Sequence, residues 1–475
     1  MGGFAVGGVT ATPAEFIHIG PFEVIFLLAL GFFGGMLSGF IGSGGAFVLT
    51  PGMMSIGAPG HIAVASNMCH KFPKAMIGAW RRAKVGHLDV KLAALMAVSA
   101  IAGVQVGIQV QKIIKEALGT AGTNLYVTTA FLIILPTVGA ICLRDAIRAK
   151  KHGIADTEPK FAKKLEQKFR IPPLITFKVA GRTQSLWLTI PTGFATGFLA
   201  ATIAVGGFIG VPSLIYIIGA PSVVASGTEL GIAFVMGSTG TWTWAYLMGA
   251  VDFRMTTLIL AASLIGVQIG AIGTTYVRQY YIKLAMGVVM LIVTLSRACA
   301  LPSILTELKW ISLDPKTVEF FSSLVMPLMV VAFLSVTPVV LVPMMKVRKR
   351  LAKEGVLEFA IDKTSHKGRV FPKMILFGAL SLTNYYLLFR DPEAWPKFIT
   401  SIPHASPLIA ALLSVGVVLL AIYWSFVHGN FAHSLLDLVK VTSLRKEVAK
   451  AISEEGLPGL EKWISKAKAT AASSK

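Results

Sequence analysis

Long apolar runs without charged residues constrain the fold of this chain more than any other feature. Two of the longest cover residues 324–345 and 409–427. A helix needs about 20 apolar residues to cross a bilayer core that is about 30 Å thick, whereas a membrane β-barrel shows short strands of alternating polarity. The sequence therefore predicts an all-α polytopic membrane protein.

Charged residues are few and unevenly placed. Only 14% of the 475 residues are charged, against about 25% in an ordinary soluble domain. The formal net charge is +21, and basic residues cluster in loops such as 144–182 and 346–350. Such loops stay in the cytoplasm, and no soluble module accompanies them that would indicate nucleic-acid binding. We expect an inner (plasma) membrane protein with its N-terminus outside and its C-terminus in the cytoplasm.

The sequence shows no catalytic or metal-binding constellation. Cys69, Cys142 and Cys299 are too widely spaced for a disulfide framework or a metal motif. The nine histidines are scattered, and Ser43 has no obvious partner that would make it a nucleophile. We therefore expect no enzyme activity, no metal and no cofactor.

The apolar runs and the basic loops together divide the chain into six parts. The predicted parts are an external N-terminal segment (1–21), transmembrane repeat 1 (22–146), a cytoplasmic basic loop (147–185), transmembrane repeat 2 (186–301), additional transmembrane helices (302–428) and a cytoplasmic amphipathic tail (429–475). The apolar stripe of the tail predicts a helix on the membrane surface. A partner-binding helix is the alternative.

Several short motifs occur twice at a nearly constant offset, which predicts an internal repeat. The pairs are Gly44-Gly45 with Gly206-Gly207, Gly57-Ala58-Pro59 with Gly219-Ala220-Pro221, Gly86-x-x-Asp89 with Gly249-x-x-Asp252, and GVQVG at 103–107 with GVQIG at 266–270. Each copy contains a broken hairpin and three full crossings, so the second copy should be inverted. Asp89 and Asp252 follow glycines at segment starts and are interpreted as helix N-caps.

Each copy also contains an apolar segment too short to span the membrane, at residues 45–57 and 207–219. Both follow a glycine-rich break, and both are predicted to be half of a broken helix. Inverted repeats with broken helices are typical of secondary transporters, whose binding site lies near the midplane. Helix N-termini at the breaks would present free backbone N–H groups to an anion. The alternative is that these glycines only permit close helix packing.

Residues 66–80 place ionisable side chains in or near the membrane, where they are costly and usually functional. Lys71 and Lys74 are three residues apart and share a helix face, so they would suit an anion. The alternative for Lys74 is that its side chain reaches to the cytoplasmic interface. The equivalent stretch of the second copy carries no charge.

Glu229 is the acidic residue of segment 222–248, and it aligns with Asn67 of the first copy. It could carry a proton for coupling or pair with Lys71, or it could make a structural hydrogen bond. His70 is a proton relay or a polar core residue. Gln105 and Gln268 would support the backbone at the breaks or contact the substrate. The predicted substrate-binding residues are Ser43, Gly44, Gly45, Asn67, His70, Lys71, Lys74, Gln105, Gly206, Gly207, Thr228, Glu229 and Gln268, with Glu229 and His70 also assigned to proton coupling.

These motifs resemble a known family. The first copy, GFFGGMLSGFIGSGGAFVLTPGMM with GAPGHIAVASN and GHLDV, and the second copy, GFATGFLAATIAVGGFIGVPSLI with GAPSVVASGTE and GAVDF, are similar to the TauE/SafE sulfite exporter family, also called the toluene-sulfonate uptake permease family. The resemblance covers roughly residues 22–301. The charged stretch His70–Lys74, the long loop 144–185 and the region 302–475 depart from the common pattern, which leaves the substrate open.

The resemblance implies a secondary transporter of small sulfur-containing anions, such as sulfite or the organosulfonates sulfoacetate and isethionate. We expect alternating access around the broken helices and coupling to protons. An anion channel on the same architecture is the alternative, and a non-transporting scaffold is a third hypothesis. The expected partners are the anionic substrate, the lipid bilayer and, as a homodimer, a second copy of the chain.

Overall fold

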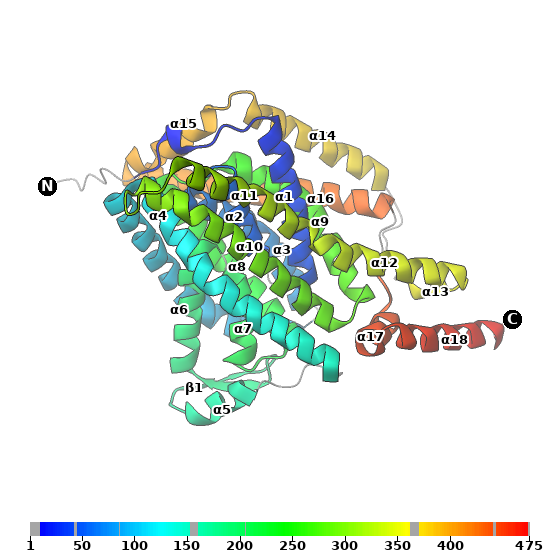
Figure 1. Ribbon diagram of the computed structural model, residues 1–475. Helices are drawn as coiled ribbons and strands as arrows, with labels where there is room; N and C mark the ends of the chain where they lie inside the picture. The colour runs from blue at the N-terminus through cyan, green and yellow to red at the C-terminus, as the bar shows by residue number, and fades with distance from the viewer. Residues whose placement is uncertain are drawn as a thin grey trace.

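The computed structural model describes residues 10–41, 45–84, 86–152, 160–204, 206–361, 370–439 and 443–473. The described chain is helical apart from one short hairpin, which confirms the predicted all-α class (Figure 1). In order, the elements are η1 (Pro13–Glu15), α1 (Pro21–Ile41), α2 (Ala46–Ser55), α3 (Gly60–Lys84), α4 (Val90–His152), α5 (Lys160–Lys168), β1 (Leu174–Phe177), β2 (Arg182–Ser185), α6 (Leu186–Ile203), α7 (Gly206–Tyr216), α8 (Ser222–Met248), α9 (Phe253–Gly273), η2 (Thr274–Tyr276), α10 (Gln279–Glu307), α11 (Pro315–Leu334), α12 (Val336–Lys353), α13 (Leu357–Ala360), α14 (Val370–Phe389), α15 (Ala394–Ser401), η3 (Ile402–His404), α16 (Pro407–Leu438), α17 (Lys446–Glu455) and α18 (Leu457–Ser473).

Seven helical stretches of the described residues are long and apolar enough to cross a membrane. They are Pro21–Phe40, Val90–Lys151, Leu186–Ile203, Phe253–Tyr276, Tyr280–Glu307, Pro315–Lys353 and Pro407–Leu438. The helix α4 runs from Val90 to His152, and it is interrupted at Gly119. Gly119 has φ 63°, a conformation that other residues rarely adopt, so it divides α4 into two helices.

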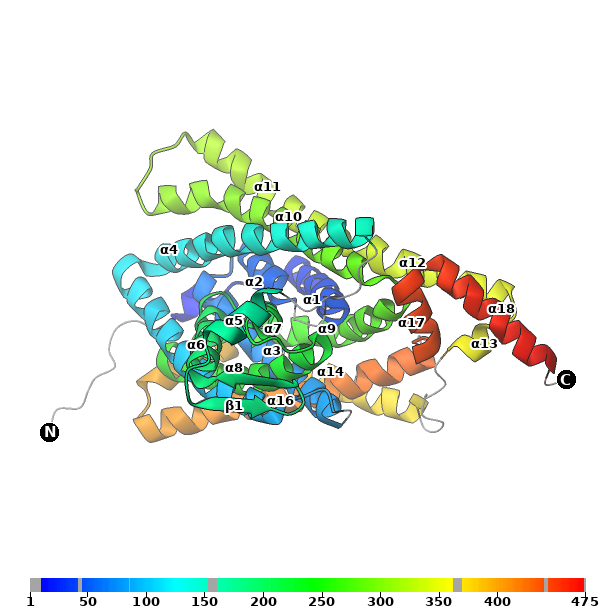
Figure 2. The same cartoon turned by 90° about the horizontal axis from the view of Figure 1, so that it is seen from below.

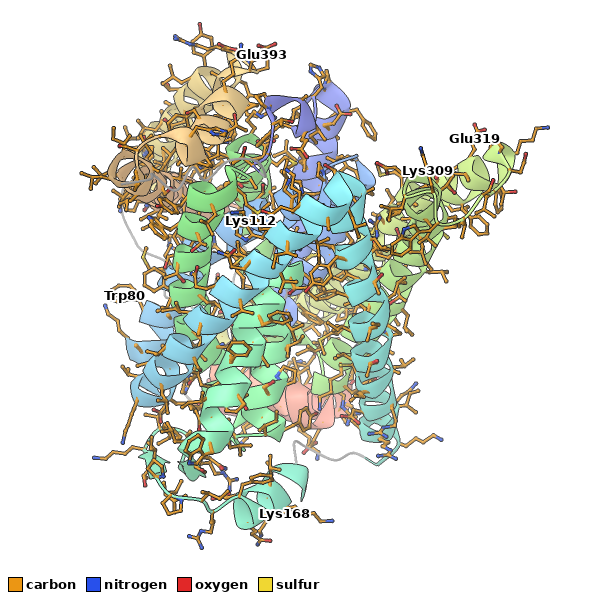
Figure 3. The ribbon with its side chains drawn as sticks, turned by 90° about the vertical axis from the view of Figure 1, so that its left-hand side faces the viewer. Trp80, Lys112, Lys168, Lys309, Glu319 and Glu393 are labelled. Carbon is orange, nitrogen blue, oxygen red and sulfur yellow. The ribbon has the colours of Figure 1, made fainter. Side chains whose placement is uncertain are left out.

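Different elements lie at the two ends of the molecule. Figure 3 shows Lys168 of α5 at one end, and Lys309, Glu319 and Glu393 at the opposite end. The helices α10 and α11 pack along each other and extend together beyond the neighbouring helices (Figure 2).

The short helices α2 and α7 have 10 and 11 residues, which confirms that both predicted segments are half-length helices. Each is followed by a glycine with positive φ, Gly57 at 91° and Gly219 at 79°. Ser43 and Gly44 lie outside the described residues, so the structure does not place the first break itself.

Glycine faces bring two helix pairs into backbone contact. A Cβ atom on Gly103 would collide with the carbonyl oxygen of Phe194 in α6, and one on Gly266 would collide with that of Phe32 in α1. The helix α4 thus packs tightly on α6, and α9 packs in the same way on α1. Small residues at helix contacts are typical of membrane proteins. The glycines of GVQVG and GVQIG therefore have a packing role.

Two hydrogen bonds link the two predicted copies in a reciprocal way. The backbone N–H of Asp252 donates to the hydroxyl of Ser66 over 2.9 Å. The backbone N–H of Asp89 donates to the hydroxyl of Thr228 over 3.1 Å. The carboxylates of Asp89 and Asp252 accept from the first turns of α4 and α9, as predicted for N-caps.

The basic loop contains structure that the sequence analysis does not predict. The strands β1 and β2 pair antiparallel, with Leu174 opposite Ser185 and Phe177 opposite Arg182. The second carboxylate oxygen of Asp89 accepts from the N–H groups of residues 179 and 180 at the tip of the hairpin. Arg182 Nε and Gln184 Nε2 donate to the carbonyls of residues 219 and 218. The hairpin is therefore bound both to the α3–α4 turn and to the α7–α8 turn.

The tail does not form one amphipathic helix, so that prediction is wrong. Residues 430–438 belong to the end of α16, and Leu444 lies between α16 and α17 in a β-bridge with Ile361. Leu444 and Val448 are buried with Leu351 of α12 in a small separate core. The apolar stripe of the tail thus packs against its own chain, because α12 supplies a complementary apolar face.

Replacing Gly103 with valine should destabilise the fold. The new side chain would meet the backbone of α6, and overpacking of this kind costs at least about 1–3 kcal/mol. The matched control is Gly416→Val in α16, where an added Cβ meets nothing within 4 Å. Thermal unfolding of the purified full-length protein would measure both. Equal melting temperatures of the two variants would contradict the packing role.

Candidate anion-binding site

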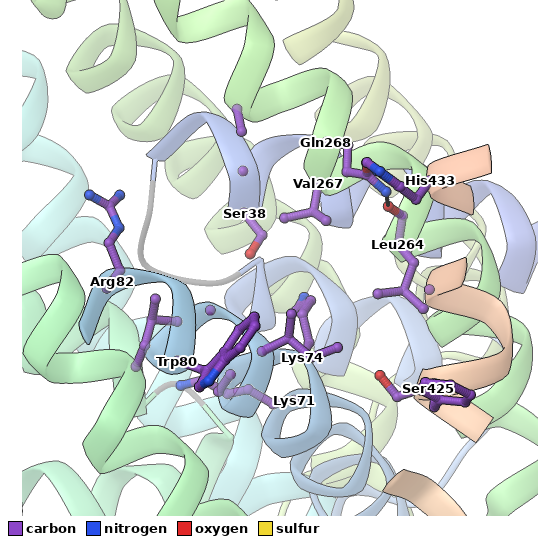
Figure 4. A pocket seen from close by; sticks show the side chains of 18 of the residues that line it. Ser38, Lys71, Lys74, Trp80, Arg82, Leu264, Val267, Gln268, Ser425 and His433 are labelled. Atoms are coloured by element: carbon purple, nitrogen blue, oxygen red, sulfur yellow. Dashed lines mark hydrogen bonds between the residues drawn. The ribbon is translucent and has the colours of Figure 1, made fainter. Parts of the chain in front are cut away.

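A cavity of about 650 Å³ lies among α1, α3, α8, α9 and α16 (Figure 4). We call it the α3 cavity, because α3 supplies its positive charge. Apolar side chains such as Ile77, Leu230 and Val267 make up part of its wall. The polar side chains that line it are Ser38, Lys71, Lys74, Arg82, Ser226, Glu229, Gln268, Ser425, Asn430 and His433.

The cationic side of the cavity comes from one face of α3. Lys71, Lys74 and Arg82 recur at intervals that return to the same side of a helix, as the sequence predicts for the first two. Glu229 of α8 is the one carboxylate among the described lining residues. The cavity therefore has an excess of positive charge, which suits an anionic ligand.

Lys71 is already paired. Its Nζ lies 3.3 Å from Oε1 of Glu229, and the two side chains are 11% and 1% exposed. Pairing with Lys71 is one of the roles that the sequence suggests for Glu229. A buried charge is stable only when it is paired and hydrogen-bonded, so each of these two groups depends on the other.

Lys74 has a different environment. Its Nζ lies 3.5 Å from the hydroxyl of Ser263 in α9, and no ion pair with a described acidic group is formed. The side chain is half-buried and lines the cavity, and Figure 4 shows it between α3 and α9. Of the two lysines, Lys74 is the one whose charge is available to a ligand.

Ser263 also makes a hydrogen bond with His70. The two side chains are 2.9 Å apart, between Nε2 and Oγ, and Nδ1 of His70 is buried without a hydrogen-bond partner in the described chain. His70 does not line the cavity. It lies one residue from Lys71 and shares a partner with Lys74, which places it beside the cationic face rather than on it.

Other predicted residues hold the protein together around the cavity. The side-chain amide of Asn67 donates to the hydroxyl of Thr50 in α2 over 2.8 Å. Thr228 caps the α3–α4 turn. The amide of Gln105 donates to Thr243 of α8 over 2.9 Å, whereas Gln268 lines the cavity and donates to the carbonyl of Leu264. Neither glutamine bonds to the backbone of a break within the described residues.

The glycines at the breaks are placed in tight contacts. A Cβ on Gly45 would collide with the backbone of Gly34 in α1, and one on Gly206 would approach Met236 and Ala200. Gly45 and Gly206 do not line the cavity, and the surroundings of Gly207 lie outside the described part of the chain. The structure therefore supports the alternative of close packing for Gly45 and Gly206.

Sequence reasoning missed several lining residues. Arg82 belongs to α3, which continues to Lys84. Arg82 follows Lys71 by about three helical turns, so helical periodicity predicts that the two side chains share one face of α3. Ser425, Asn430 and His433 belong to α16, and no sequence pattern indicates which surface that helix covers.

Breaking the Lys71–Glu229 pair from either side should destabilise the protein. Lys71→Met leaves a buried carboxylate, and Glu229→Leu leaves a buried ammonium; a lone buried charge of this kind costs about 3–5 kcal/mol. The double variant removes both charges and should recover most of the loss. Thermal unfolding of the three variants forms a double-mutant cycle. Additive losses in the double variant would show that the two charges do not interact.

Comparison with known proteins shows the family to which the chain is related. The model of the family described as "Sulfite exporter TauE/SafE" matches residues 27–297. A protein of Bacillus subtilis (strain 168), named "Probable membrane transporter protein YjnA", is 24% identical over 257 residues, which are 52% of this chain and 88% of that protein. No solved structure matches the chain significantly. Since the family match covers more than half of the sequence, this chain belongs to the TauE/SafE sulfite exporter family of membrane transporters.

Proposed function

We propose that the protein is a secondary transporter of small sulfur-containing anions, either sulfite or organosulfonates such as sulfoacetate and isethionate. The observation that carries the proposal is the α3 cavity, in which three cations of one helix face a single carboxylate. The family description supports a sulfur oxyanion as cargo. Because the cavity lies among the helices of both predicted copies, its position also agrees with the binding site of inverted-repeat transporters.

The first step is capture of the anion by Lys74. Its ammonium has no acidic partner in the described chain, and the guanidinium of Arg82 lines the same cavity. Hydrogen bonds between charged donors and an oxyanion are the strong ones. The hydroxyl of Ser38 and the amide of Gln268 supply further polar groups around the bound anion.

The second step couples the anion to a proton through Glu229. While Glu229 is ionised, it neutralises Lys71. When Glu229 takes up a proton, Lys71 is released and the cavity gains a second free ammonium. Binding of the proton and binding of the anion then favour each other by the same factor. The other charged or titratable groups that face Glu229 across the cavity are Lys74, Arg82 and His433, and His70 lies behind the cationic face.

The third step is a change of access between the two sides of the membrane. The reciprocal contacts of α1 with α9 and of α4 with α6 support an inverted repeat, as do the two hydrogen bonds of Asp89 and Asp252. In such transporters one copy rocks against the other around a fixed site. The predicted orientation places the basic hairpin end of the molecule in the cytoplasm.

Lys74→Met should strongly weaken anion binding, because it removes the ammonium that lacks an acidic partner. The measurement is the thermal stabilisation of purified protein by sulfite, isethionate and a carboxylate control, since a ligand that binds the folded state raises its stability. Lys84→Met is the matched control, because Lys84 is on the same helix but lies over the ring of Trp80. Undiminished stabilisation of Lys74→Met by both sulfur anions would refute the assigned role.

Glu229→Gln should remove the pH dependence of transport. Wild-type uptake is expected to increase as the pH falls, because protonation of Glu229 releases Lys71. Glutamine is neutral at every pH, so the variant should behave throughout like the protonated protein. Isethionate uptake into liposomes is the suitable assay, because a sulfonate keeps its charge over the whole range and the profile then reports on the protein.

An unchanged pH profile in Glu229→Gln would exclude Glu229 as the coupling group. The same liposomes distinguish a carrier from the alternative anion channel. A channel would give an electrical current far above the turnover of a carrier, and that result would overturn the transporter proposal.

A further inference from the structure

The helix α16 (Pro407–Leu438) lies beyond the family match, which ends at residue 297. It nevertheless packs against α8, α9 and α3, the helices that carry the charged and polar wall of the α3 cavity. Five of its residues line that cavity: Ser425, Phe426, Gly429, Asn430 and His433. A helix outside the family region thus closes one side of the candidate site.

Ser425 is the most informative of these residues. It is 1% exposed, and its hydroxyl has no hydrogen-bond partner within the described chain. Buried polar groups nearly always have a partner, and a helical serine normally satisfies itself on the carbonyl four residues earlier. Ser414 of the same helix does so, with a bond of 2.8 Å to Ala410. In Figure 4 the oxygen of Ser425 points from α16 toward the side of Lys71 and Lys74.

Gly429 lies one helical turn after Ser425. An added Cβ at this position meets nothing within 4 Å, in contrast with the glycines that hold α1 against α9. The space in front of Gly429 therefore belongs to the cavity and not to a helix contact. His433 follows one turn later at the edge of the cavity, 3.6 Å from the carboxylate of Asp437.

We propose that α16 is the specificity-determining wall of the α3 cavity. The hydroxyl of Ser425 donates a hydrogen bond to the bound anion, opposite the cationic face of α3. The open space at Gly429 receives the part of the ligand that projects from its anionic group, so the size of that part is selected by a helix outside the family region. This inference depends on the proposed function, since it requires the cavity to bind an anion.

The space at Gly429 is tested by filling it. Gly429→Leu should weaken binding of benzenesulfonate about tenfold or more, because a side chain then occupies the volume of the ring, whereas sulfite binding should change by less than about twofold. Gly416→Leu is the matched control, since it makes the same change in α16 at a position that is equally open but does not line the cavity. Both ligands should bind this control as they bind the wild type.

The hydroxyl is tested by Ser425→Ala, with Ser414→Ala as its control in the same helix. Loss of one hydrogen bond to a charged ligand should weaken both sulfite and benzenesulfonate about tenfold, and the control should bind both normally. Isothermal titration of the full-length protein in detergent measures all the affinities, and thermal unfolding checks that each variant is folded.

The outcomes separate this inference from the proposed function. If the wild type binds the anions and Lys74→Met does not, while Gly429→Leu and Ser425→Ala both bind as the wild type does, the role of α16 is refuted and the anion site stands. If the wild type binds neither probe, the proposed function fails and the inference fails with it. If Gly429→Leu loses binding of benzenesulfonate but keeps binding of sulfite, and Gly416→Leu binds both, the specificity-determining role of α16 is supported.

Discussion

The structure depends most on how the chain accommodates a cationic helix face inside a membrane protein. The helix α3 carries Lys71 and Lys74 among apolar neighbours, and an unpaired charge in such surroundings is costly. Two neighbouring helices stabilise the two lysine side chains in different ways. The helix α8 supplies Glu229 to Lys71 as a buried partner, and α9 supplies the hydroxyl of Ser263 to Lys74. Lys71, Lys74 and Arg82 all line the α3 cavity, so the cationic face of α3 forms one wall of that space.

The positions of α8 and α9 around α3 are fixed by close backbone packing elsewhere. Apolar helices gain little from one another in lipid, which is as apolar as their side chains, so close contact and hydrogen bonds must hold them. The glycines of α9 bring it against α1, and those of α4 bring it against α6. Ser66 and Thr228 then bond to the turns that precede α9 and α4. These contacts place Ser263 and Glu229 within reach of the lysines.

The sequence predicted the features that depend on local spacing. The half-length helices follow from glycine breaks, the caps at Asp89 and Asp252 follow from their position at segment starts, and the shared face of Lys71 and Lys74 follows from helical periodicity. Features that depend on distant surfaces were not predictable. The pairing of Gln105 with Thr243, the burial of the tail against α12 and the placement of Ser425 in the cavity each require knowing which helices meet. Propensity and spacing carry no such information.

The β1–β2 hairpin and the helix α15 contact corresponding turns of the two predicted copies. At one end the β1–β2 hairpin is bound by Asp89 at the turn before α4. At the other end, the indole of Trp395 in α15 donates to the carbonyl of Val251 in the turn before α9, and Arg254 in the first turn of α9 donates to the carbonyl of Pro392. The turn before α4 accommodates a hydrogen bond from Asp89 to Thr228 of α8, and the turn before α9 a hydrogen bond from Asp252 to Ser66 of α3. The hairpin of the basic loop and the C-terminal extension therefore contact the turns before α4 and α9, while α16 of the same extension lines one side of the α3 cavity.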